Sequence, residues 1–254
     1  MSRAYAIGDI HGHVAKLREA HFLIEEDRRR VGDHAAPVVH LGDLVDRGPH
    51  SRDVIDFLID GMSDNPHWVV LKGNHDHMFA RFMLEPGIKD EHLREGISWL
   101  HPAIGGRSTL ESYGLSSTVH DDPWVVHAAA LKLIPDTHVT FLAGLPLWHR
   151  YGEALFVHGG IKPGVPMSEQ SPNDLMWIRA PFHSDTSDHG FLVVHGHTPV
   201  PEATHYGNRL NCDSGAAFGG PLSAVVIEGR EAWLLTPGGR HPLLPVWGGD
   251  DDAV

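Results

Sequence analysis

The chain has 254 residues, of which 41% are hydrophobic and 21% are charged, proportions that are ordinary for a soluble globular protein. They exclude a mostly disordered chain, a collagen-like chain and a small disulfide-stapled one. Lys and Arg together number 20 against 33 Asp and Glu, so the formal charge is −13. This balance argues against a nucleic-acid binder, which needs a basic surface. It does not exclude a phosphate substrate, because bound cations can invert the local field.

The sequence also indicates a compartment. The single cysteine, Cys212, allows no internal disulfide, which fits a reducing environment. The N-terminus lacks the apolar segment of a signal peptide, and no apolar run reaches the roughly 18 residues of a membrane-spanning helix. We therefore expect a cytoplasmic protein that has no membrane partner.

The first 80 residues repeat a strand, a polar loop and a helix three times. The predicted strands are 5–7, 37–41 and 68–71, and the predicted helices are 14–26, 51–59 and 78–84. Ser51 is expected to cap the second helix. This order is typical of an α/β fold, whose functional residues gather at the carboxyl ends of the strands.

The later part of the chain changes character. Residues 78–148 are predicted to hold further helices, at 91–99 and from Asp136 or Thr137 to 142, and are a possible helical cap over the site. Four β-type runs then predict a second, largely antiparallel sheet: 154–157, 191–194, 223–227 and 231–235. Because no Ser/Gly linker divides the chain, we expect one α/β domain, residues 1–247, of two packed sheets flanked by helices. The acidic tail 248–254 is expected to be disordered.

Five segments share one design, in which a short apolar strand ends in a glycine-flanked cluster of Asp, Asn or His. They are 8–12, 42–48, 73–76, 157–160 and 195–199. A lone Gly-Asp pair usually marks only a turn, but five such ends in order are hard to explain as turns. Carboxylate, imidazole and amide ligands suit divalent cations such as manganese, iron or zinc. The chain has 22 histidines, and most of them are expected at the surface or in the core, because two ions need only a handful.

At these residues the chain resembles the calcineurin-like metallophosphoesterases, and among them the phosphoprotein-phosphatase branch. The signatures GDxHG, GDxVDRG and GNHE of that branch recur almost letter for letter between Gly8 and His75. The likeness extends to about Gly220 and is strongest to compact bacterial members known as serine/threonine protein phosphatases or as diadenosine tetraphosphate hydrolases. It implies a sandwich of two mixed β-sheets flanked by helices.

The resemblance also implies a centre of two divalent cations, with manganese expected first and iron or zinc as alternatives. Asp9 and His11 would bind the first ion, and Asp43 would bridge both ions. The second ion would be completed by three further side chains, Asn74, His158 and His197. A hydroxide shared by the two ions would attack phosphorus directly, with no covalent enzyme intermediate.

Four more residues receive catalytic roles from the same likeness. His75 would be the general acid that protonates the leaving oxygen, and Asp46 would hold the other ring nitrogen of His75. Arg47 and, by a looser motif, Arg179 would bind phosphate oxygens through their planar guanidinium groups.

Several positions keep two readings. His195 is either a packed core ring, which we favour, or a supporting partner of a ligand. Arg179 is alternatively a surface arginine, and Asp213 either bonds a ligand histidine or closes a turn. Asp76 stands where the family usually has Glu, so a different supporting contact is expected. Pro199 replaces the last histidine of the Gly-His-x-His motif of related diesterases, which favours the phosphatase branch.

Three functions follow from this pattern. The first expectation is removal of phosphate from phosphoserine or phosphothreonine in proteins, and the alternative is symmetrical hydrolysis of bis(5'-nucleosyl) tetraphosphates. A non-catalytic metal-binding scaffold is a minor third, because Asp46, Arg47 and His75 would then have no task. The first two share the core and would differ in residues 78–148. The expected partner is thus a phosphorylated protein or a nucleotide, and no oligomeric state is predicted.

Overall fold

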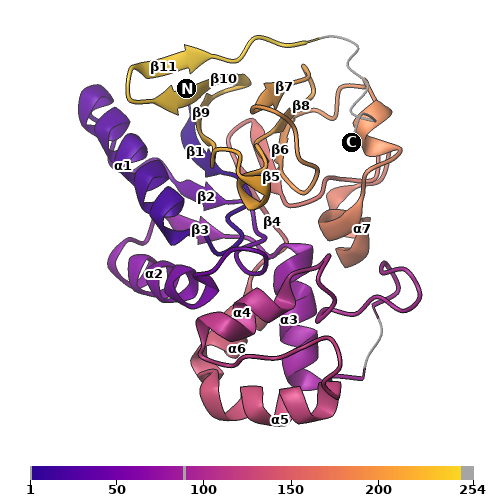
Figure 1. Ribbon diagram of the computed structural model, residues 1–254. Helices are drawn as coiled ribbons and strands as arrows, with labels where there is room; N and C mark the ends of the chain where they lie inside the picture. The colour runs from indigo at the N-terminus through magenta and orange to yellow at the C-terminus, as the bar shows by residue number, and fades with distance from the viewer. Residues whose placement is uncertain (1, 88–89, 247–254) are drawn as a thin grey trace.

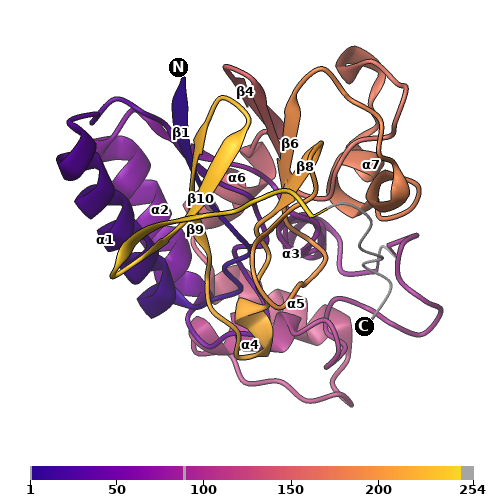
Figure 2. The same ribbon diagram turned by 90° about the horizontal axis from the view of Figure 1, so that it is seen from above.

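The computed structural model describes residues 2–87 and 90–246 and shows two β-sheets packed face to face, with helices on their outer sides (Figure 1). The first sheet is covered by α1 (Val14–Val31) and α2 (Ser51–Asp64), and the second by α7 (Pro172–Trp177), as the view from above also shows (Figure 2). This confirms the predicted α/β/β/α sandwich. The predicted disordered tail, 248–254, lies outside the described residues.

The first sheet has six strands in the order β11-β10-β9-β1-β2-β3. Its parallel half consists of β1 (Arg3–Ile7), β2 (Val38–His40) and β3 (Trp68–Val70). Its antiparallel half consists of β9 (Ala224–Glu228), β10 (Glu231–Thr236) and β11 (Gly239–Pro242). The predicted repeat of strand and helix therefore forms one half of this sheet.

The second sheet corrects one expectation. Its order is β4-β5-β6-β8-β7, from β4 (Trp148–Tyr151), β5 (Ala154–Val157), β6 (Leu192–His195), β8 (Arg209–Asn211) and β7 (Thr204–His205). The prediction of a largely antiparallel sheet is wrong, because β5, β6 and β8 are parallel and only the edge strands are antiparallel. The runs 223–227 and 231–235 pair with the first sheet instead, where Ala224 lies opposite Ile7.

Strand alternation builds the layers. Tyr5 and Ile7 of β1 are buried in a cluster that includes residues of α1 and α2, whereas Ala4 and Ala6 join the cluster between the sheets. Successive side chains point to opposite faces of a strand, so one strand supplies both layers. Phe156 of β5 packs between the sheets. This shared packing supports our proposal of one domain.

Helices α3 (Asn74–Leu84), α4 (Gly106–Ser112), α5 (Pro123–Leu133) and α6 (Asp136–Gly144) gather at one end of the sandwich (Figure 1). The predicted helix at 91–99 is wrong: this segment forms turns, and Gly96 has a φ of 81°, which a right-handed helix does not tolerate. Helix α5 went unpredicted, although Asp122 caps it by accepting from the amide of Trp124.

Three 3₁₀ turns complete the elements: η1 (Met167–Glu169), η2 (Phe182–Ser184) and η3 (Ala216–Phe218). Within the described residues, every helix is too short or too polar to cross a lipid bilayer.

Candidate metal centre and active site

The carboxyl ends of strands from both sheets meet at one place. Asp9 and His11 follow β1, Asp43 follows β2, and Asn74 is the first residue of α3. From the second sheet, His158 follows β5 and His197 follows β6. All six predicted ligands are more than nine-tenths buried. Side-chain atoms of His11, His158 and His197 lie close to Asp43, whereas Asp9 reaches this group through the backbone amide of His197. The structure therefore brings together side chains that are up to 188 positions apart in the sequence, as in the contact of Asp9 with His197.

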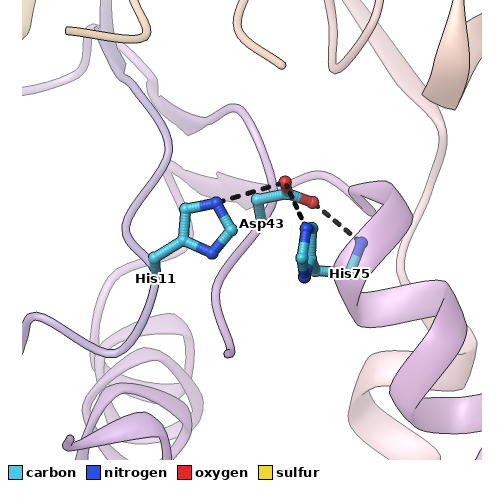
Figure 3. A group of neighbouring side chains, drawn as sticks. All are labelled: His11, Asp43 and His75. Atoms are coloured by element: carbon cyan, nitrogen blue, oxygen red, sulfur yellow. Dashed lines mark hydrogen bonds and ion pairs between the residues drawn. The ribbon is translucent and has the colours of Figure 1, made fainter. Parts of the chain in front are cut away.

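Asp43 lies at the middle of the cluster (Figure 3). Its Oδ2 is 3.4 Å from Nε2 of His11 and 4.0 Å from Nε2 of His75, and its Oδ1 is 3.3 Å from Nε2 of His158. Two groups of ligand atoms each lie within 4.8 Å of one another: His11, Asp43 and His75, and Asp43, His158 and His197. Asp43 belongs to both groups, which is the arrangement required of a bridging carboxylate.

Backbone carbonyls fix the imidazole rings. The Nδ1 atoms of His11 and His158 donate to the carbonyls of Val45 (2.8 Å) and Leu41 (2.9 Å). Since a neutral ring has only one N–H, Nε2 of each ring then carries a lone pair. Both lone pairs point into the cluster, which is the form in which histidine binds a metal.

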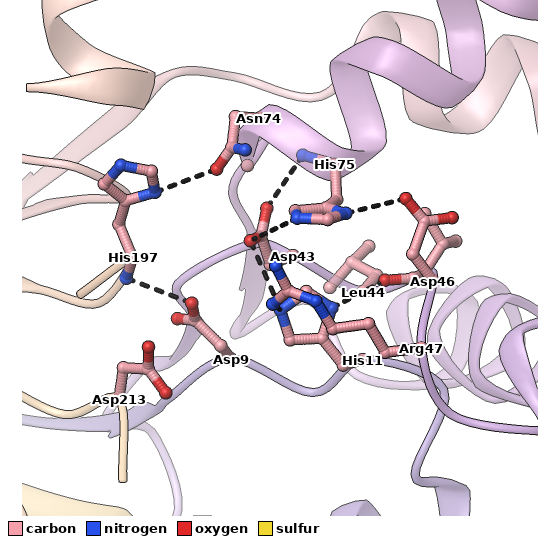
Figure 4. Close-up of polar contacts among 12 residues, drawn as sticks. Asp9, His11, Asp43, Leu44, Asp46, Arg47, Asn74, His75, His197 and Asp213 are labelled. Carbon is pink, nitrogen blue, oxygen red and sulfur yellow. Dashed lines mark hydrogen bonds and ion pairs between the residues drawn. The ribbon is translucent and has the colours of Figure 1, made fainter. Parts of the chain in front are cut away.

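Asn74 contacts both histidines of the second group, His158 and His197; its contact with His197 is drawn in Figure 4. Its Oδ1 is 2.9 Å from Nε2 of His158 and 2.9 Å from Nδ1 of His197. With His158 neutral and its Nδ1 donating to Leu41, Oδ1 of Asn74 and Nε2 of His158 are both acceptors, and a cation beside them would make their close approach favourable. This donor set of oxygen and imidazole nitrogen fits a divalent cation.

The electrostatics of the cluster point the same way. Burial lowers the pKa of His11, His158 and His197, so these rings are neutral at neutral pH and can act as ligands. Burial, followed by the charges of Asp213 and Asp43, raises the pKa of Asp9 well above its usual range. Among the described residues, Oδ1 of Asp9 is buried without a hydrogen-bond partner. Cations would offset this crowding of negative charge.

The backbone is strained where the site is built. Five described non-glycine residues have a φ in the left-handed region, and all five were predicted site residues: His11 (45°), Asp43 (49°), Asp46 (72°), Arg47 (67°) and His197 (70°). Two glycines allow close approach to the carboxylates. A Cβ on Gly73 would lie 2.2 Å from Oδ1 of Asp43, and one on Gly196 would lie 2.0 Å from Oδ1 of Asp9.

The predicted acid and its partner are also in contact. Nδ1 of His75 donates to Oδ2 of Asp46 at 2.7 Å, which leaves Nε2 of His75 facing Asp43 (Figure 4). Arg47 donates to Nε2 of His11 at 2.9 Å, so its guanidinium lies at the rim of the first group. Arg179 is exposed and donates to Thr198 Oγ1 at 3.3 Å, beside His197. Asp46, Arg47 and Arg179 surround the cluster, whereas His75 also lies in the group of His11 and Asp43.

The structure shows the contacts of three residues whose roles the sequence left open: Asp76, Asp213 and His195. The carboxylate of Asp76 accepts from the backbone amides of Leu44 and Gly73, each at 2.9 Å, which ties two site loops together. Asp213 closes a turn by accepting from the amide of Gly215 and lies near Asp9 (Figure 4). His195 is fully buried and packs at 5.1 Å from the ring of Phe182.

Sequence reasoning missed several supporting residues. Trp99 and Thr109 both donate to the carboxylate of Asp46, and Ser51, predicted as a helix cap, instead lies against the backbone amide of Asp46. Trp99 and Thr109 come from the segment 78–148, where no motif singled them out. Phe218 is 68% exposed, and its ring centroid lies 5.0 Å from the guanidinium carbon of Arg47.

Comparisons with known proteins agree with this geometry. The model of the calcineurin-like phosphoesterase family matches residues 2–227. A protein of Anoxybacillus flavithermus named asymmetrical bis(5'-nucleosyl)-tetraphosphatase PrpE is 27% identical, with 86% of this chain and 88% of the relative covered. Its namesake in Halalkalibacterium halodurans is 26% identical, with 94% of each chain covered.

Solved structures show the same fold. A candidate diadenosine tetraphosphatase superposes with a TM-score of 0.60 at 21% identity, covering 96% of this chain and 94% of that one. A cold-active protein tyrosine phosphatase superposes with a TM-score of 0.61 at 15% identity, covering 96% and 79%.

Proposed function

The chain belongs to the calcineurin-like phosphoesterase family and is thus a metal-dependent phosphatase, and on this premise we propose that it hydrolyses bis(5'-nucleosyl) tetraphosphates. The reaction would take place at the cluster formed by Asp9, His11, Asp43 and their neighbours. The relatives in A. flavithermus and H. halodurans carry this activity in their names, and the similarity spans 86–94% of the chain. That extent is the observation that carries the proposal, because it includes the segment 78–148.

The first proposed ion site consists of Asp9, His11 and Asp43, and the second of Asp43, Asn74, His158 and His197. Two divalent cations bound there would supply Lewis acidity toward the phosphoryl group and a water acidic enough to serve as nucleophile near neutral pH. Manganese remains the first expectation for their identity, and iron and zinc remain alternatives.

The residues around the ions would divide the remaining work. Arg47 and Arg179 would bind nonbridging phosphate oxygens, which their planar guanidinium groups can contact in pairs. His75, held through Nδ1 by Asp46, would give its Nε2 proton to the leaving oxygen. The arrangement therefore offers charge neutralisation and proton transfer at one cluster.

An exposed aromatic ring favours a nucleotide. Phe218 lies in η3 between Gly215 and Gly219, and the Lys16 ammonium anchors this turn by donating to the carbonyls of Ala216 and Gly220. Because the ring lies beside Arg47, a base could stack on Phe218 while Arg47 binds a phosphate of the same molecule. A phosphoserine side chain has no planar group for this ring.

The cleavage pattern we propose is asymmetrical. The sequence alone suggested symmetrical hydrolysis as the alternative function, whereas the curated relatives are named as asymmetrical enzymes. Asymmetrical hydrolysis of diadenosine tetraphosphate gives ATP and AMP, and symmetrical hydrolysis gives two ADP. The products therefore distinguish the two patterns directly.

The test is a panel of substrates with manganese at matched concentrations. We expect diadenosine tetraphosphate to be hydrolysed with a kcat/KM at least about tenfold above that for phosphoserine and phosphothreonine peptides, and with ATP and AMP as products. Two ADP as the products would contradict asymmetrical cleavage. A higher kcat/KM for the phosphopeptides would overturn the nucleotide proposal in favour of a phosphoprotein substrate.

The phosphoprotein expectation stays a prediction. The solved protein tyrosine phosphatase shares only 15% identity with this chain and shows the fold alone. A scaffold without catalysis would require that neither substrate class is hydrolysed by the metal-loaded protein, and the same panel measures this.

A further inference from the structure

The carboxylate of Asp46 is held by two side chains from the segment that follows α3, Trp99 in a turn and Thr109 in α4. Asp46 is completely buried, and its Oδ2 accepts from Nδ1 of His75 at 2.7 Å and from Nε1 of Trp99 at 2.9 Å. Its Oδ1 accepts from the hydroxyl of Thr109 at 2.7 Å. Both oxygens are thus fixed by donors from a segment that supplies none of the predicted metal ligands.

We propose that Trp99 and Thr109 are positioning residues, which hold Asp46 so that His75 presents its proton to the leaving group. The inference rests on the proposed function, because it assigns the task of the segment 78–148 within that reaction. It concerns the geometry of the proton donor rather than the binding of ions. A carboxylate held at one oxygen only can rotate about its Cβ–Cγ bond, and His75 would then lose its fixed partner.

The indole of Trp99 is itself held rigidly. Trp99 is 5% exposed, and its ring lies 4.7 Å from the ring of Phe82 and 5.6 Å from that of Phe79. Both phenylalanines belong to α3, the helix whose second residue is His75. A Cβ on Gly106 would lie 2.4 Å from the indole, so a glycine there lets α4 approach this ring. One helix therefore carries the proton donor and also supports the group that orients its partner.

Thr109 completes the arrangement from α4. Its hydroxyl donates to Oδ1 of Asp46 and accepts from the backbone amide of Asp46 at 2.8 Å. The hydroxyl of Ser51 lies 3.1 Å from that of Thr109 and also faces the amide of Asp46. These contacts hold both the side chain and the left-handed backbone of Asp46, whose φ is 72°. Asp46 is thereby fixed at three atoms.

Because these contacts hold the partner of the proton donor, their loss should slow some substrates more than others. A proton donor matters most when the leaving oxygen is strongly basic and least when the leaving group departs unprotonated. Loss of an ordinary packing contact would slow all substrates alike. The dependence of kcat on the basicity of the leaving group therefore separates a positioning role from a structural one.

The experiment uses Trp99→Phe in the full-length, manganese-loaded protein. This change keeps an aromatic ring and removes the N–H, and kcat and KM are measured with phenyl phosphate and with p-nitrophenyl phosphate. We expect kcat for phenyl phosphate to fall about tenfold, on the scale of one lost hydrogen bond to a charged group. For p-nitrophenyl phosphate we expect a change of less than about twofold, with KM and metal content unchanged.

The chain offers matched controls. Nε1 of Trp68 has no partner among the described residues, so Trp68→Phe removes an N–H without removing a hydrogen bond and should leave both rates unchanged. If Trp99→Phe is not folded, Thr109→Val removes the other donor at nearly constant volume. Thr109→Ser should restore the ratio of the two rates.

Each result decides a separate question. Equal losses on both aryl phosphates, or no loss on either, would overturn the positioning role of Trp99 and Thr109 while leaving the phosphatase reaction intact. If the wild-type protein hydrolyses neither aryl phosphate nor diadenosine tetraphosphate, the proposed function itself fails.

Discussion

The protein contains two groups of buried histidines that differ in chemistry. The site cluster consists of His11, Asp43, His75, His158 and His197, at the strand ends. The back cluster consists of His21, His40 and Trp68, between α1, β2 and β3. In the back cluster, Nε2 of His21 lies 2.9 Å from Nε2 of His40, and the ring of His21 stacks on that of Trp68 at 4.1 Å.

The two clusters differ in the atoms that the ring nitrogens face. In the back cluster Nδ1 of His40 also donates to a carbonyl, that of Val69, but Nε2 of His40 then accepts from Nε2 of His21. In the site cluster, carbonyls of Val45 and Leu41 occupy Nδ1 of two rings and turn the remaining lone pairs toward a carboxylate. Burial lowers the pKa of His11, His158 and His197 in the site cluster. It also lowers the pKa of both rings of the back cluster, to about 2 for His21 and about 4 for His40.

The comparison shows that a group of buried histidines is not sufficient for a metal centre. The back cluster has two neutral rings but no oxygen ligand between them, whereas Asp43 supplies that oxygen at the site cluster. A carboxylate shared by several rings therefore distinguishes the site cluster from the back cluster.

Asp43→Asn should produce the largest loss. An amide cannot bridge two cations as a carboxylate does, so activity should fall on the order of 10⁴-fold or more. Elemental analysis of the purified protein should show fewer than two ions per chain. His21→Gln in the back cluster is the matched control and should keep both ions. Retention of both ions and of activity in Asp43→Asn would break the distinction between the clusters.

His75→Asn should reduce turnover while leaving the ions bound. General acid catalysis typically contributes about 10²–10⁴-fold, and we expect a loss in this range for phenyl phosphate, whose leaving oxygen is strongly basic. The loss should be smaller for p-nitrophenyl phosphate and for diadenosine tetraphosphate, whose leaving groups need a proton less. His75 lies in the group of His11 and Asp43, so loss of metal from this variant would show that it is a ligand instead.

Phe218→Ala should weaken nucleotide binding at the rim of the site cluster. Stacking of a base on an aromatic ring contributes about 1–3 kcal/mol, so KM for diadenosine tetraphosphate should rise at least about fivefold. Phe218→Tyr should keep the wild-type KM. Inhibition by inorganic tripolyphosphate, which has no base, should be unchanged in both variants. An unchanged KM in Phe218→Ala would remove this ring from the substrate site.

His21→Gln should change the pH dependence of folding stability. Activity at pH 7 should stay within about twofold of the wild-type value, because the back cluster is remote from the site cluster. Burial, followed by the charges of His40 and Arg28, lowers the pKa of His21 from its ordinary 6.5 to about 2 in the folded protein. The unfolded chain therefore takes up a proton at His21 as the pH falls below about 6.5, whereas the folded chain does not. Folding stability is therefore lost on acidification. Between roughly pH 6 and pH 4, His21 contributes about 1.4 kcal/mol per pH unit to the slope of the unfolding free energy against pH.

Urea unfolding of the metal-free protein at several pH values measures this slope. Glutamine cannot titrate but can still donate to Nε2 of His40. In the variant, the unfolding free energy should therefore depend less steeply on pH, by about 1.4 kcal/mol per pH unit. Identical slopes for wild type and variant would indicate that His21 is not buried as a neutral ring.

The placement of the predicted ligands at one edge could be anticipated, because each follows a strand and has a glycine nearby. Asp9, Asp43 and Asn74 occur in short, contiguous motifs, and the parallel order of β1, β2 and β3 places their carboxyl ends together. His158 and His197 follow the strands of the second sheet in the same manner. Local sequence patterns therefore contained both the fold class and the predicted ligands.

The remaining features of the fold and of the site depend on tertiary contacts that sequence patterns do not encode. Whether 223–227 joins the first or the second sheet is decided by tertiary pairing, since an apolar run has no preferred partner. The turn at Gly96 ends a helical pattern that side-chain periodicity alone favoured. Trp99 and Thr109 contact Asp46 across more than 50 residues, and their side chains look like ordinary core residues in the sequence.

Anomalous diffraction from crystals grown with manganese locates the ions themselves. We expect two peaks, one beside Asp9 and His11 and one beside Asn74, His158 and His197, with Asp43 between them and a separation of about 3.5–4 Å. No peak is expected beside His21 and His40. A single peak that Asp43 does not contact, or a peak at the back cluster with none at the strand ends, would show that Asp43 does not bridge two ions.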